Sequence, residues 1–349
     1  MPIRVKCEGR IFGIKMFKSI GKTPSKSERE EFIKKTQYFD GLKFRNIHNL
    51  PLMVGVKSKR AKDTHPKNML PVIKHKKIDA ALKGELNIYW LGHSSVLLQL
   101  GEKNILIDPV LTKYASPFNF IGVKRFSDVP IEPCDLPYID ILMISHDHYD
   151  HLDYQTIMKI KNKVGYIIVP LGVESFIKSW GIEEDKIKSL SWWENIEIEG
   201  LCITATPAQH FSTRNPIKSN ATWWCGFCIK DDKHTVYYSG DGGYSDTFKK
   251  IGERFDIDLA FMECGQYDEA WPSCHMFPEQ TAKATFDVGA KWCIPVHWGT
   301  FCLCNSSWND SIKRIVSEAD NIGINVATPY IGECINYKNI EKHQERWWV

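Results

Sequence analysis

The sequence predicts an α/β protein of the αββα sandwich type, in which two sheets lie face to face between outer helices. From residue 86 onward, strand-like runs alternate with single helix-like segments, the order expected of sheets covered by helices. Residues of metal-ligand type follow strand-like runs in both halves of this region, and two facing sheets can bring such positions to one edge. Residues 1–84 show only weak periodicity. We therefore expect a basic N-terminal arm (1–84) packed on a catalytic domain (85–349).

The strand-like runs are short stretches of apolar, β-branched and aromatic residues bounded by glycine and polar turns. They cover residues 86–91, 95–100, 104–108, 139–145, 164–169, 196–205, 222–230, 235–239, 259–264, 292–296 and 324–327. Helical texture is found at residues 154–162, 173–180, 247–254, 278–287 and 308–322. In the arm, Ser25 followed by Glu28 indicates a helix start, because a serine cap and an acidic first turn complement the free backbone N–H groups.

Composition excludes several classes of protein. A chain of 349 residues that is 43% hydrophobic and 25% charged is neither disordered nor collagen-like. No apolar run reaches the roughly 18 residues of a spanning helix, and the first residues lack the apolar stretch of a secretion signal. The eleven cysteines follow no paired framework, which fits a reducing compartment. We expect a cytoplasmic protein.

The net charge of +3 hides an uneven distribution. Residues 1–80 hold 20 Lys and Arg against 7 Asp and Glu, whereas residues 81–349 hold 25 against 35. A basic arm of this kind either binds an anionic surface, such as acidic lipid headgroups, or is a solvated cover segment. The catalytic part is itself acidic, so we expect peripheral membrane contact and no nucleic-acid partner. The sequence leaves a homodimer open.

The strongest functional signal is the six-residue sequence His146-Asp147-His148-Tyr149-Asp150-His151, directly after the apolar run 141–144. In an extended chain His146 and His148 point the same way, so one cation can take both imidazoles. Asp150 and His151 turn toward a neighbouring position. Four ligand-capable side chains in six residues predict two metal ions.

Three later residues of ligand type also follow strand-like runs: His210, Asp241 and His297. Taken singly, each has a structural alternative, because a satisfied core histidine or a turn aspartate is common without a metal. The six-residue motif favours the ligand interpretation for all three together. Five histidines and two aspartates then complete two nearly tetrahedral spheres that share one carboxylate, which predicts two Zn²⁺ ions per chain.

The order of these ligands resembles that of the metallo-β-lactamase-fold hydrolases. Longer stretches between about residues 86 and 330 are similar to the N-acylphosphatidylethanolamine-hydrolysing phospholipases D. The matching stretches are YWLGHSS (89–95), IDP (107–109), ASP (115–117), GVKRF (122–126), LPYID (136–140), PAQH (207–210) and IPVHWGTF (294–301). The resemblance therefore implies a metallo-β-lactamase fold and hydrolysis of a lipid phosphodiester.

The resemblance also implies roles for individual residues. Asp241 bridges the two zinc ions, and His275 lies near the reacting phosphate, so that His275 and Asp150 are the expected catalytic residues. The remaining ligands divide into His146, His148 and His210 for one ion and Asp150, His151 and His297 for the other. This chain departs from those phospholipases near the substrate, at Thr213-Arg214 in place of Lys-Arg, Cys274 in place of an amide residue and Gly242 in place of a hydroxyl residue.

The expected mechanism uses the metal pair as a clamp. Two cations lower the pKa of a bridging water toward ~7 and hold the attacking and leaving oxygens of an in-line displacement. Arg214 or His275 would add positive charge where the leaving oxygen develops its negative charge. We expect Arg214, Trp223 and His275 to contact the substrate. His93 is either a structural residue or a partner of a metal ligand.

We therefore expect a zinc-dependent hydrolase of the phospholipase D type, a phosphodiesterase that acts on N-acyl phosphatidylethanolamine or a related lipid through a metal-bridging hydroxide. The alternative on the same site is a lactonase that opens a sugar-phosphate lactone. Nucleic-acid processing is a third interpretation. An apolar groove beside the metals would favour the lipid, a small polar pocket the lactone, and a positive channel continuous with the arm a nucleic acid.

Overall fold

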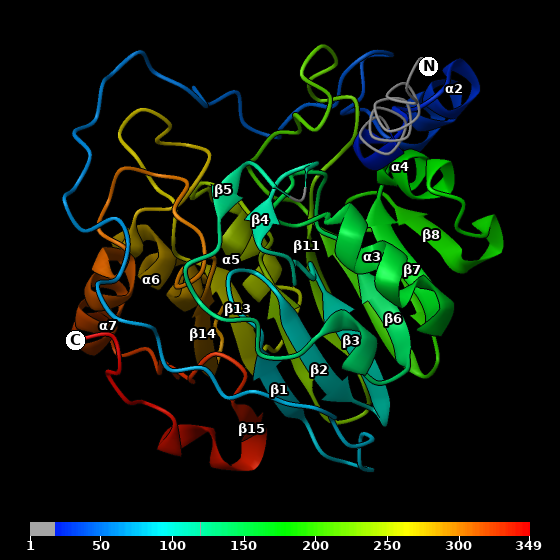
Figure 1. Ribbon diagram of the computed structural model, residues 1–349. Helices are drawn as coiled ribbons and strands as arrows, with labels where there is room; N and C mark the ends of the chain where they lie inside the picture. The colour runs from blue at the N-terminus through cyan, green and yellow to red at the C-terminus, as the bar shows by residue number, and fades with distance from the viewer. Residues whose placement is uncertain (1–17, 119) are drawn as a thin grey trace, which may run out of the picture.

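The computed structural model describes residues 18–118 and 120–349, and its centre is formed by two sheets packed face to face (Figure 1). The seven-stranded sheet has the order β15-β1-β2-β3-β6-β7-β8. Its strands are β1 (Asn87–Trp90), β2 (Val96–Leu100), β3 (Lys103–Ile107), β6 (Ile139–Met143), β7 (Val164–Pro170), β8 (Ile187–Leu190) and β15 (Cys334–Asn336).

The six-stranded sheet has the order β14-β13-β12-β11-β10-β9. Its strands are β9 (Asn195–Ile198), β10 (Leu201–Thr206), β11 (Gly226–Lys230), β12 (Thr235–Tyr238), β13 (Leu259–Glu263) and β14 (Trp292–Val296). A separate two-stranded ribbon consists of β4 (Tyr114–Ala115) and β5 (Val123–Lys124).

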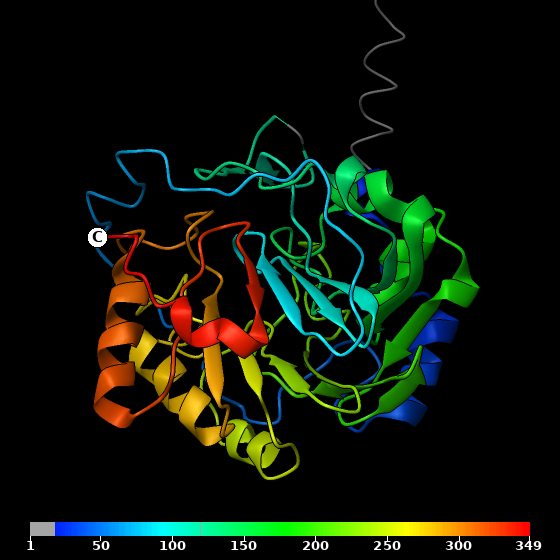
Figure 2. The same cartoon turned by 90° about the horizontal axis from the view of Figure 1, so that it is seen from below.

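Helices cover the outer faces of both sheets, which confirms the predicted αββα sandwich (Figure 2). The helices α3 (Tyr154–Ile160) and α4 (Val173–Ser179) share one apolar cluster with the seven-stranded sheet. On the six-stranded sheet, a second cluster joins α5 (Thr247–Gly252), α6 (Pro278–Asp287) and α7 (Asp310–Ile322) to the strands. The layers follow from the period of two, because alternate residues of β3 enter different clusters: Ile105 and Ile107 between the sheets, and Leu106 beneath the helices.

Several strands of both sheets end at the same rim. In the seven-stranded sheet, β3, β6, β7 and β8 run parallel to one another. In the six-stranded sheet, β12, β13 and β14 are parallel. The carboxyl ends of parallel strands lie at one edge of a sheet, where side chains from different strands can converge. Asp108, Ser145, Asp241, Glu263 and His297 all lie at or just beyond such strand ends.

The arm residues 18–84 lie across the outside of the sandwich. They contain the helix α2 (Lys26–Lys35), which begins at Ser25 with the predicted cap: the Ser25 side chain accepts from the Glu28 backbone N–H and the Glu28 carboxylate accepts from the Ser25 backbone N–H. Beyond α2, Phe39 and Phe44 enter the core between the sheets. The boundary at residue 84 stays a prediction, as does everything proposed for residues 1–17, which lie outside the described residues.

Three predicted strands differ from the structure. The run 196–205 is a hairpin of β9 and β10, because Glu199 (φ 52°) and Gly200 (φ 81°) form a two-residue turn with positive φ angles. The run 222–230 is a strand only from Gly226. The run 324–327 is not a strand and makes a single bridge, from Val326 to Cys293. Burial also differs within two of these runs, because residues 196–200 and 324–325 are half-buried or exposed.

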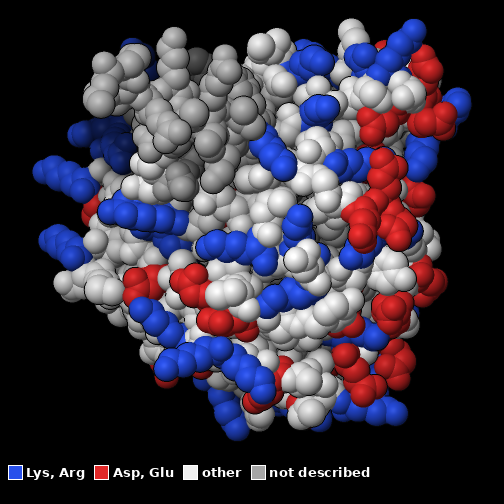
Figure 3. All heavy atoms as spheres, turned by 45° about the vertical axis from the view of Figure 1, so that its right-hand side comes forward, with Lys and Arg blue, Asp and Glu red and all other residues white. Residues whose placement is uncertain are grey.

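The surface shows no simple division of charge. Figure 3 shows Lys and Arg side chains across the middle of one face and Asp and Glu side chains gathered along one edge of it. Among the described residues, no helix has the combined length and hydropathy to cross a bilayer.

Candidate metal centre

The loop after β6 brings the first group of candidate ligands together. His146 Nε2 lies 2.9 Å from His148 Nδ1, and His210 Nε2 lies 3.2 Å from the same nitrogen. His210 reaches this point from the segment that follows β10. Three imidazole nitrogens from two sheets therefore converge on one small volume, as the sequence predicts for these residues.

A second group forms beside the first. Asp150 Oδ2 lies 3.2 Å from His297 Nε2 and 3.6 Å from His151 Nε2. Asp241 Oδ2 lies between the two groups: it is 3.0 Å from His151 Nε2 and 3.1 Å from His297 Nε2 on one side. On the other side it is 3.8 Å from His146 Nε2 and 3.9 Å from His210 Nε2. Asp241 is thus the carboxylate placed to serve both groups.

The far nitrogen of four of the five candidate imidazoles has a hydrogen-bond partner, and His297 Nδ1 is the exception. His210 Nδ1 donates to the Cys274 carbonyl oxygen at 3.0 Å, and His151 Nδ1 donates to Asp108 Oδ2 at 2.7 Å. In the neutral ring, each of these bonds places the proton on Nδ1 and directs the Nε2 lone pair toward the other candidate ligands. Orientation of a ligating imidazole through its second nitrogen is typical of metal sites.

Three residues that contact the candidate ligands are His93, Asp108 and Glu263. The sequence predicts a role for none of them except His93, for which it leaves two alternatives open. His93 Nε2 donates to Asp150 Oδ2 at 2.9 Å, so the structure identifies His93 as a partner of a candidate ligand. Asp108 also accepts from the Tyr238 hydroxyl at 2.7 Å. Glu263 accepts from His275 Nδ1 at 2.8 Å and lies 3.5 Å from His297 Nδ1. Asp108 and Glu263 directly follow or end apolar runs, which is the signal that could have identified them.

Burial shapes the protonation of the site. The pKa of His146 is held well below its usual value by burial and by the neighbouring His151 and His148. The pKa of Asp241 lies well below its usual value, because the charges of His151 and His297 outweigh the opposing effect of burial. The imidazoles of His146, His148 and His210 are therefore held neutral, the form that binds metal, because burial lowers the pKa of all three. His151 differs: although burial opposes it, the neighbouring carboxylates of Asp241, Asp150 and Asp108 raise its pKa well above the usual value.

The donor set fits divalent metal ions. Four candidate donors from His146, His148, His210 and Asp241, and four more from His93, Asp150, His151 and His297, lie within 4.8 Å of one another in each group. In the described part of the chain, His151 Nε2 and Asp241 Oδ1 are buried without a hydrogen-bond partner. Buried polar atoms without partners are costly, and a cation between the two groups would satisfy them. Nitrogen and carboxylate donors of this kind are typical of zinc and other transition metals.

His275 lies beside the metal-binding groups. Its ring stacks on that of His297 with centroids 5.1 Å apart, and it meets the His210 ring edge-on at 5.2 Å. Because Nδ1 donates to Glu263, Nε2 is the nitrogen on the opposite side of the ring from this bond. Next to His275 is a cavity of about 200 Å³ with a mainly apolar lining. It is lined by Met53, Phe211, Gln266, Trp271, Cys274, His275 and Leu303.

Two predicted substrate residues lie elsewhere. Arg214 is 1% exposed, and its guanidinium donates to the carbonyl oxygens of Ser19, Ile20, Asp147 and Leu152. Trp223 is fully buried between the rings of Phe44 and Trp192. These placements contradict the prediction that Arg214 and Trp223 contact substrate, because one side chain is used to tie loops together and the other belongs to the core.

The arm contributes to the centre through Asn46. Its side chain donates to the His210 carbonyl oxygen at 2.9 Å and accepts from the His210 backbone N–H at 3.1 Å. Trp224 Nε1 donates to the same Asn46 oxygen at 2.9 Å. The arm thereby fixes the backbone of a candidate ligand.

Comparisons with known proteins agree with this geometry. The β-lactamase superfamily domain matches residues 103–298. An uncharacterized protein of Mycobacterium tuberculosis is 36% identical over 256 residues, which are 72% of this chain and 68% of that protein. N-acyl-phosphatidylethanolamine-hydrolyzing phospholipase D 1 of Caenorhabditis elegans is 33% identical over 250 residues, 67% of this chain and 70% of that protein.

A solved structure supports the fold. Igni18, a metallo hydrolase from Ignicoccus hospitalis, superposes with a TM-score of 0.55 at 19% identity, covering 72% of this chain and 98% of that one. The fold, the clustered His and Asp residues and the matched domain agree. The chain belongs to the metallo-β-lactamase superfamily, as a metal-dependent hydrolase that resembles the N-acylphosphatidylethanolamine-hydrolysing phospholipases D.

Proposed function

We propose that the protein is a dinuclear zinc phosphodiesterase of the phospholipase D type that hydrolyses N-acyl phosphatidylethanolamine or a related lipid. The observation that carries the proposal is the apolar cavity next to His275. Phe211, Trp271 and Leu303 line it, and apolar walls of this kind suit an acyl chain better than a sugar phosphate. The phospholipase of Caenorhabditis elegans, 33% identical to this chain, supports the same substrate class.

The proposed ligand sets are those implied by the resemblance, and the interatomic distances support them. His146, His148 and His210 would hold one zinc ion, and Asp150, His151 and His297 the other, with Asp241 between them. When bound, the two ions supply Lewis-acid charge and a water of lowered pKa. Asp108 and His93 keep His151 and Asp150 in position for this binding.

His275 is the proposed catalytic residue of the chain itself. Glu263 fixes the His275 ring through Nδ1. In the doubly protonated ring, whose positive charge Glu263 would offset, Nε2 can donate its proton to the oxygen of the departing N-acylethanolamine. The cavity beside it would exclude water from the acyl chain. Cleavage breaks the bond between phosphorus and that oxygen. The oxygen of water forms the new bond to phosphorus, and phosphatidic acid is the second product.

A lipid substrate requires contact with a membrane surface, and the arm offers one. Leu50, Met53 and Val56 are 40%, 71% and 50% exposed, and Met53 lines the cavity. The next residues include Lys57 and Lys59, both exposed. We propose that this ridge contacts the bilayer peripherally, because exposed apolar side chains followed by cations suit an anionic lipid interface.

The activity test uses the zinc-loaded protein with N-acyl phosphatidylethanolamine in vesicles and, separately, with a sugar-phosphate lactone. We expect phosphatidic acid and N-acylethanolamine by mass spectrometry, and His275→Asn should lower the rate roughly 100-fold or more. Metal content of that variant, measured by elemental analysis, should remain at the wild-type value. Rapid opening of the lactone with every phospholipid intact would replace the phospholipase proposal with the lactonase one.

The membrane test compares two double variants. Leu50→Ser with Val56→Ser should lower hydrolysis of lipid in vesicles roughly tenfold, because two partly inserted side chains are lost. A water-soluble phosphodiester should be cleaved at the wild-type rate. Leu42→Ser with Leu82→Ser is the matched control, since these leucines are 67% and 60% exposed away from the cavity. Equal effects of the two double variants on vesicles would contradict the ridge.

A further inference from the structure

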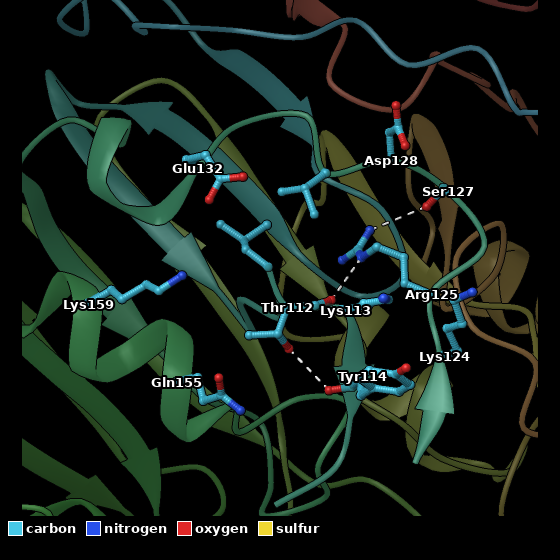
Figure 4. Close-up of a pocket in the computed structure, with 12 residues that line it drawn as sticks. Thr112, Lys113, Tyr114, Lys124, Arg125, Ser127, Asp128, Glu132, Gln155 and Lys159 are labelled. Carbon is cyan, nitrogen blue, oxygen red and sulfur yellow. Dashed lines mark hydrogen bonds between the residues drawn. The ribbon is translucent and has the colours of Figure 1, made fainter. Parts of the chain in front are cut away.

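A second cavity lies apart from the candidate metal centre, between the β4–β5 ribbon and α3 (Figure 4). Its volume is about 440 Å³, which is within the usual range of ligand sites. None of its lining residues is a candidate metal ligand. The cavity therefore needs an explanation separate from the proposed hydrolysis.

The lining is rich in positive charge. Lys113, Lys124, Arg125 and Lys159 line the cavity, against two carboxylates, Asp128 and Glu132. Asp128 is already paired, because its Oδ2 lies 2.6 Å from Lys74 Nζ. In the described residues, none of the three lining lysines forms an ion pair. The cavity thus has an excess of positive charge.

Arg125 adds a buried positive charge to the lining of the cavity. The residue is 7% exposed, and its guanidinium donates to the Thr112 and Val110 carbonyl oxygens and to the Ser127 hydroxyl. Within the described chain these partners are neutral, and no carboxylate pairs with the guanidinium. Asp153 and Asp128 act on this guanidinium only from beyond ion-pair distance, so its burial remains costly and a bound anion would offset part of that cost.

The side chains approach from two walls. Figure 4 shows Lys159 and Gln155 extending from α3 on one side, with Lys113 and Arg125 on the other. Three chain segments supply these groups: residues 111–114, residues 124–132 and α3. Cations and an amide on opposite walls can surround a compact anion, whereas a flat surface patch of lysines cannot.

We propose that this cavity is a binding site for a phosphate monoester dianion. Such a group has close to two negative charges at neutral pH and three acceptor oxygens. It therefore matches the charge of two lysines and a buried guanidinium better than a ligand with one carboxylate would. Lys113 and Lys159 contact the phosphate directly, and Gln155 can donate to one of its oxygens. Free phosphate and the headgroup of phosphatidic acid share this chemistry.

The experiment measures protection of individual lysines. Reductive methylation of the zinc-loaded protein, followed by mass spectrometry, reports the accessibility of each amine. Inorganic phosphate at saturating concentration should slow modification of Lys113 and Lys159 at least threefold and leave Lys249 and Lys338, exposed lysines elsewhere, unchanged. Vesicles of phosphatidylcholine with and without phosphatidic acid form the second arm, which separates the lipid headgroup from free phosphate.

Variants give an independent measurement. Calorimetric titration with inorganic phosphate should show that Lys113→Gln with Lys159→Gln weakens this site about tenfold or more, because two charge-assisted contacts are lost. Lys249→Gln with Lys338→Gln removes the same charge and should bind phosphate as the wild type does. Protection by phosphate alone assigns the free anion, and protection only by phosphatidic acid vesicles assigns the headgroup. Unchanged modification of Lys113 and Lys159 in both arms, or equal phosphate binding by both double variants, overturns the proposal.

Discussion

The two halves of the candidate metal centre are built from similar ligands but are held by different partners. In the neutral half, His146, His148 and His210 are backed by the Ser145 hydroxyl, the Thr213 hydroxyl and the Cys274 carbonyl oxygen, at 2.9, 3.1 and 3.0 Å. In the acidic half, which comprises Asp150, His151 and His297, two histidines are backed by carboxylates.

The carboxylates of the acidic half are fully buried. Asp108 lies 2.7 Å from His151 Nδ1 and Glu263 3.5 Å from His297 Nδ1, and both residues are 0% exposed. A carboxylate behind an imidazole makes it a more basic ligand and adds negative charge near the cation. Similar imidazoles can therefore differ in the charge behind them, and under the proposed two-ion assignment we expect the acidic half to hold its ion more tightly.

We expect the largest effect from a substitution of Asp241, the carboxylate that lies between the two halves. Asp241→Asn should weaken both cation sites together, by more than the 10–100-fold typical of a lost outer partner, because Asp241 is within 3.9 Å of four candidate ligand nitrogens. Competition with a chromophoric chelator measures both affinities, and hydrolysis should fall with them. Wild-type metal content in this variant would show that Asp241 bridges nothing.

Asp108→Asn should separate the halves. The variant keeps the shape of the side chain but removes the charge behind His151, so cation binding in the acidic half should weaken roughly 10–100-fold. The neutral half should change little, although the Ser145 hydroxyl, which lies 2.9 Å from His146 Nδ1, also donates to Asp108. Cobalt substitution followed by absorption spectroscopy can report the two sites separately. Equal weakening of both would remove the distinction between them.

Gradual metal removal is the third test. Increasing concentrations of a chelator should empty the neutral half first, and the two dissociation constants should differ by about tenfold or more, as expected from the carboxylates behind His151 and His297. A first-released ion from the acidic half would reverse our assignment. Elemental analysis of the partly depleted protein measures the number of metal ions that remain bound per chain.

The smallest effect concerns a single hydroxyl. Thr213 Oγ1 lies 3.1 Å from His148 Nε2 at a partly exposed position, so Thr213→Val removes a hydrogen bond worth about 1 kcal/mol that water can partly replace. Cation affinity in the neutral half should fall about fivefold or less, as measured by the same chelator competition. A loss as large as that of Asp108→Asn would mean that neutral and charged partners matter equally here.

The candidate ligands could be predicted from sequence because each follows a strand-like run and four of them share one short motif. His146, His148 and Asp150 needed only the period of an extended chain and the chemistry of their side chains. The structure brings these ligands together with His210 and His297, from the other sheet. Their division between two zinc ions stays a proposal.

The residues that contact the candidate ligands were harder to predict than the candidate ligands themselves, because their role depends on how deeply each side chain is buried and which way it points. Glu263 was read only as part of an apolar run, and nothing in that run shows that its carboxylate meets two imidazoles. Arg214 shows the opposite error: a charged residue near a ligand in sequence is buried against backbone carbonyls. Sequence pattern gives periodicity and residue type, whereas the pairing of a buried charge is set by tertiary packing.

The late position of β15 in the sequence affects how the chain folds during synthesis. This strand pairs with β1 over Asn87–Tyr89 and Cys334–Asn336, so one edge of the seven-stranded sheet is covered by a strand that is synthesised after the other six. Until then β1 exposes an unpaired row of backbone groups, which can recruit strands from other chains. A ribosome that stalls after residue 330 would therefore present a nearly complete sandwich with an open edge, and such a nascent chain should depend on chaperones more than the finished protein does.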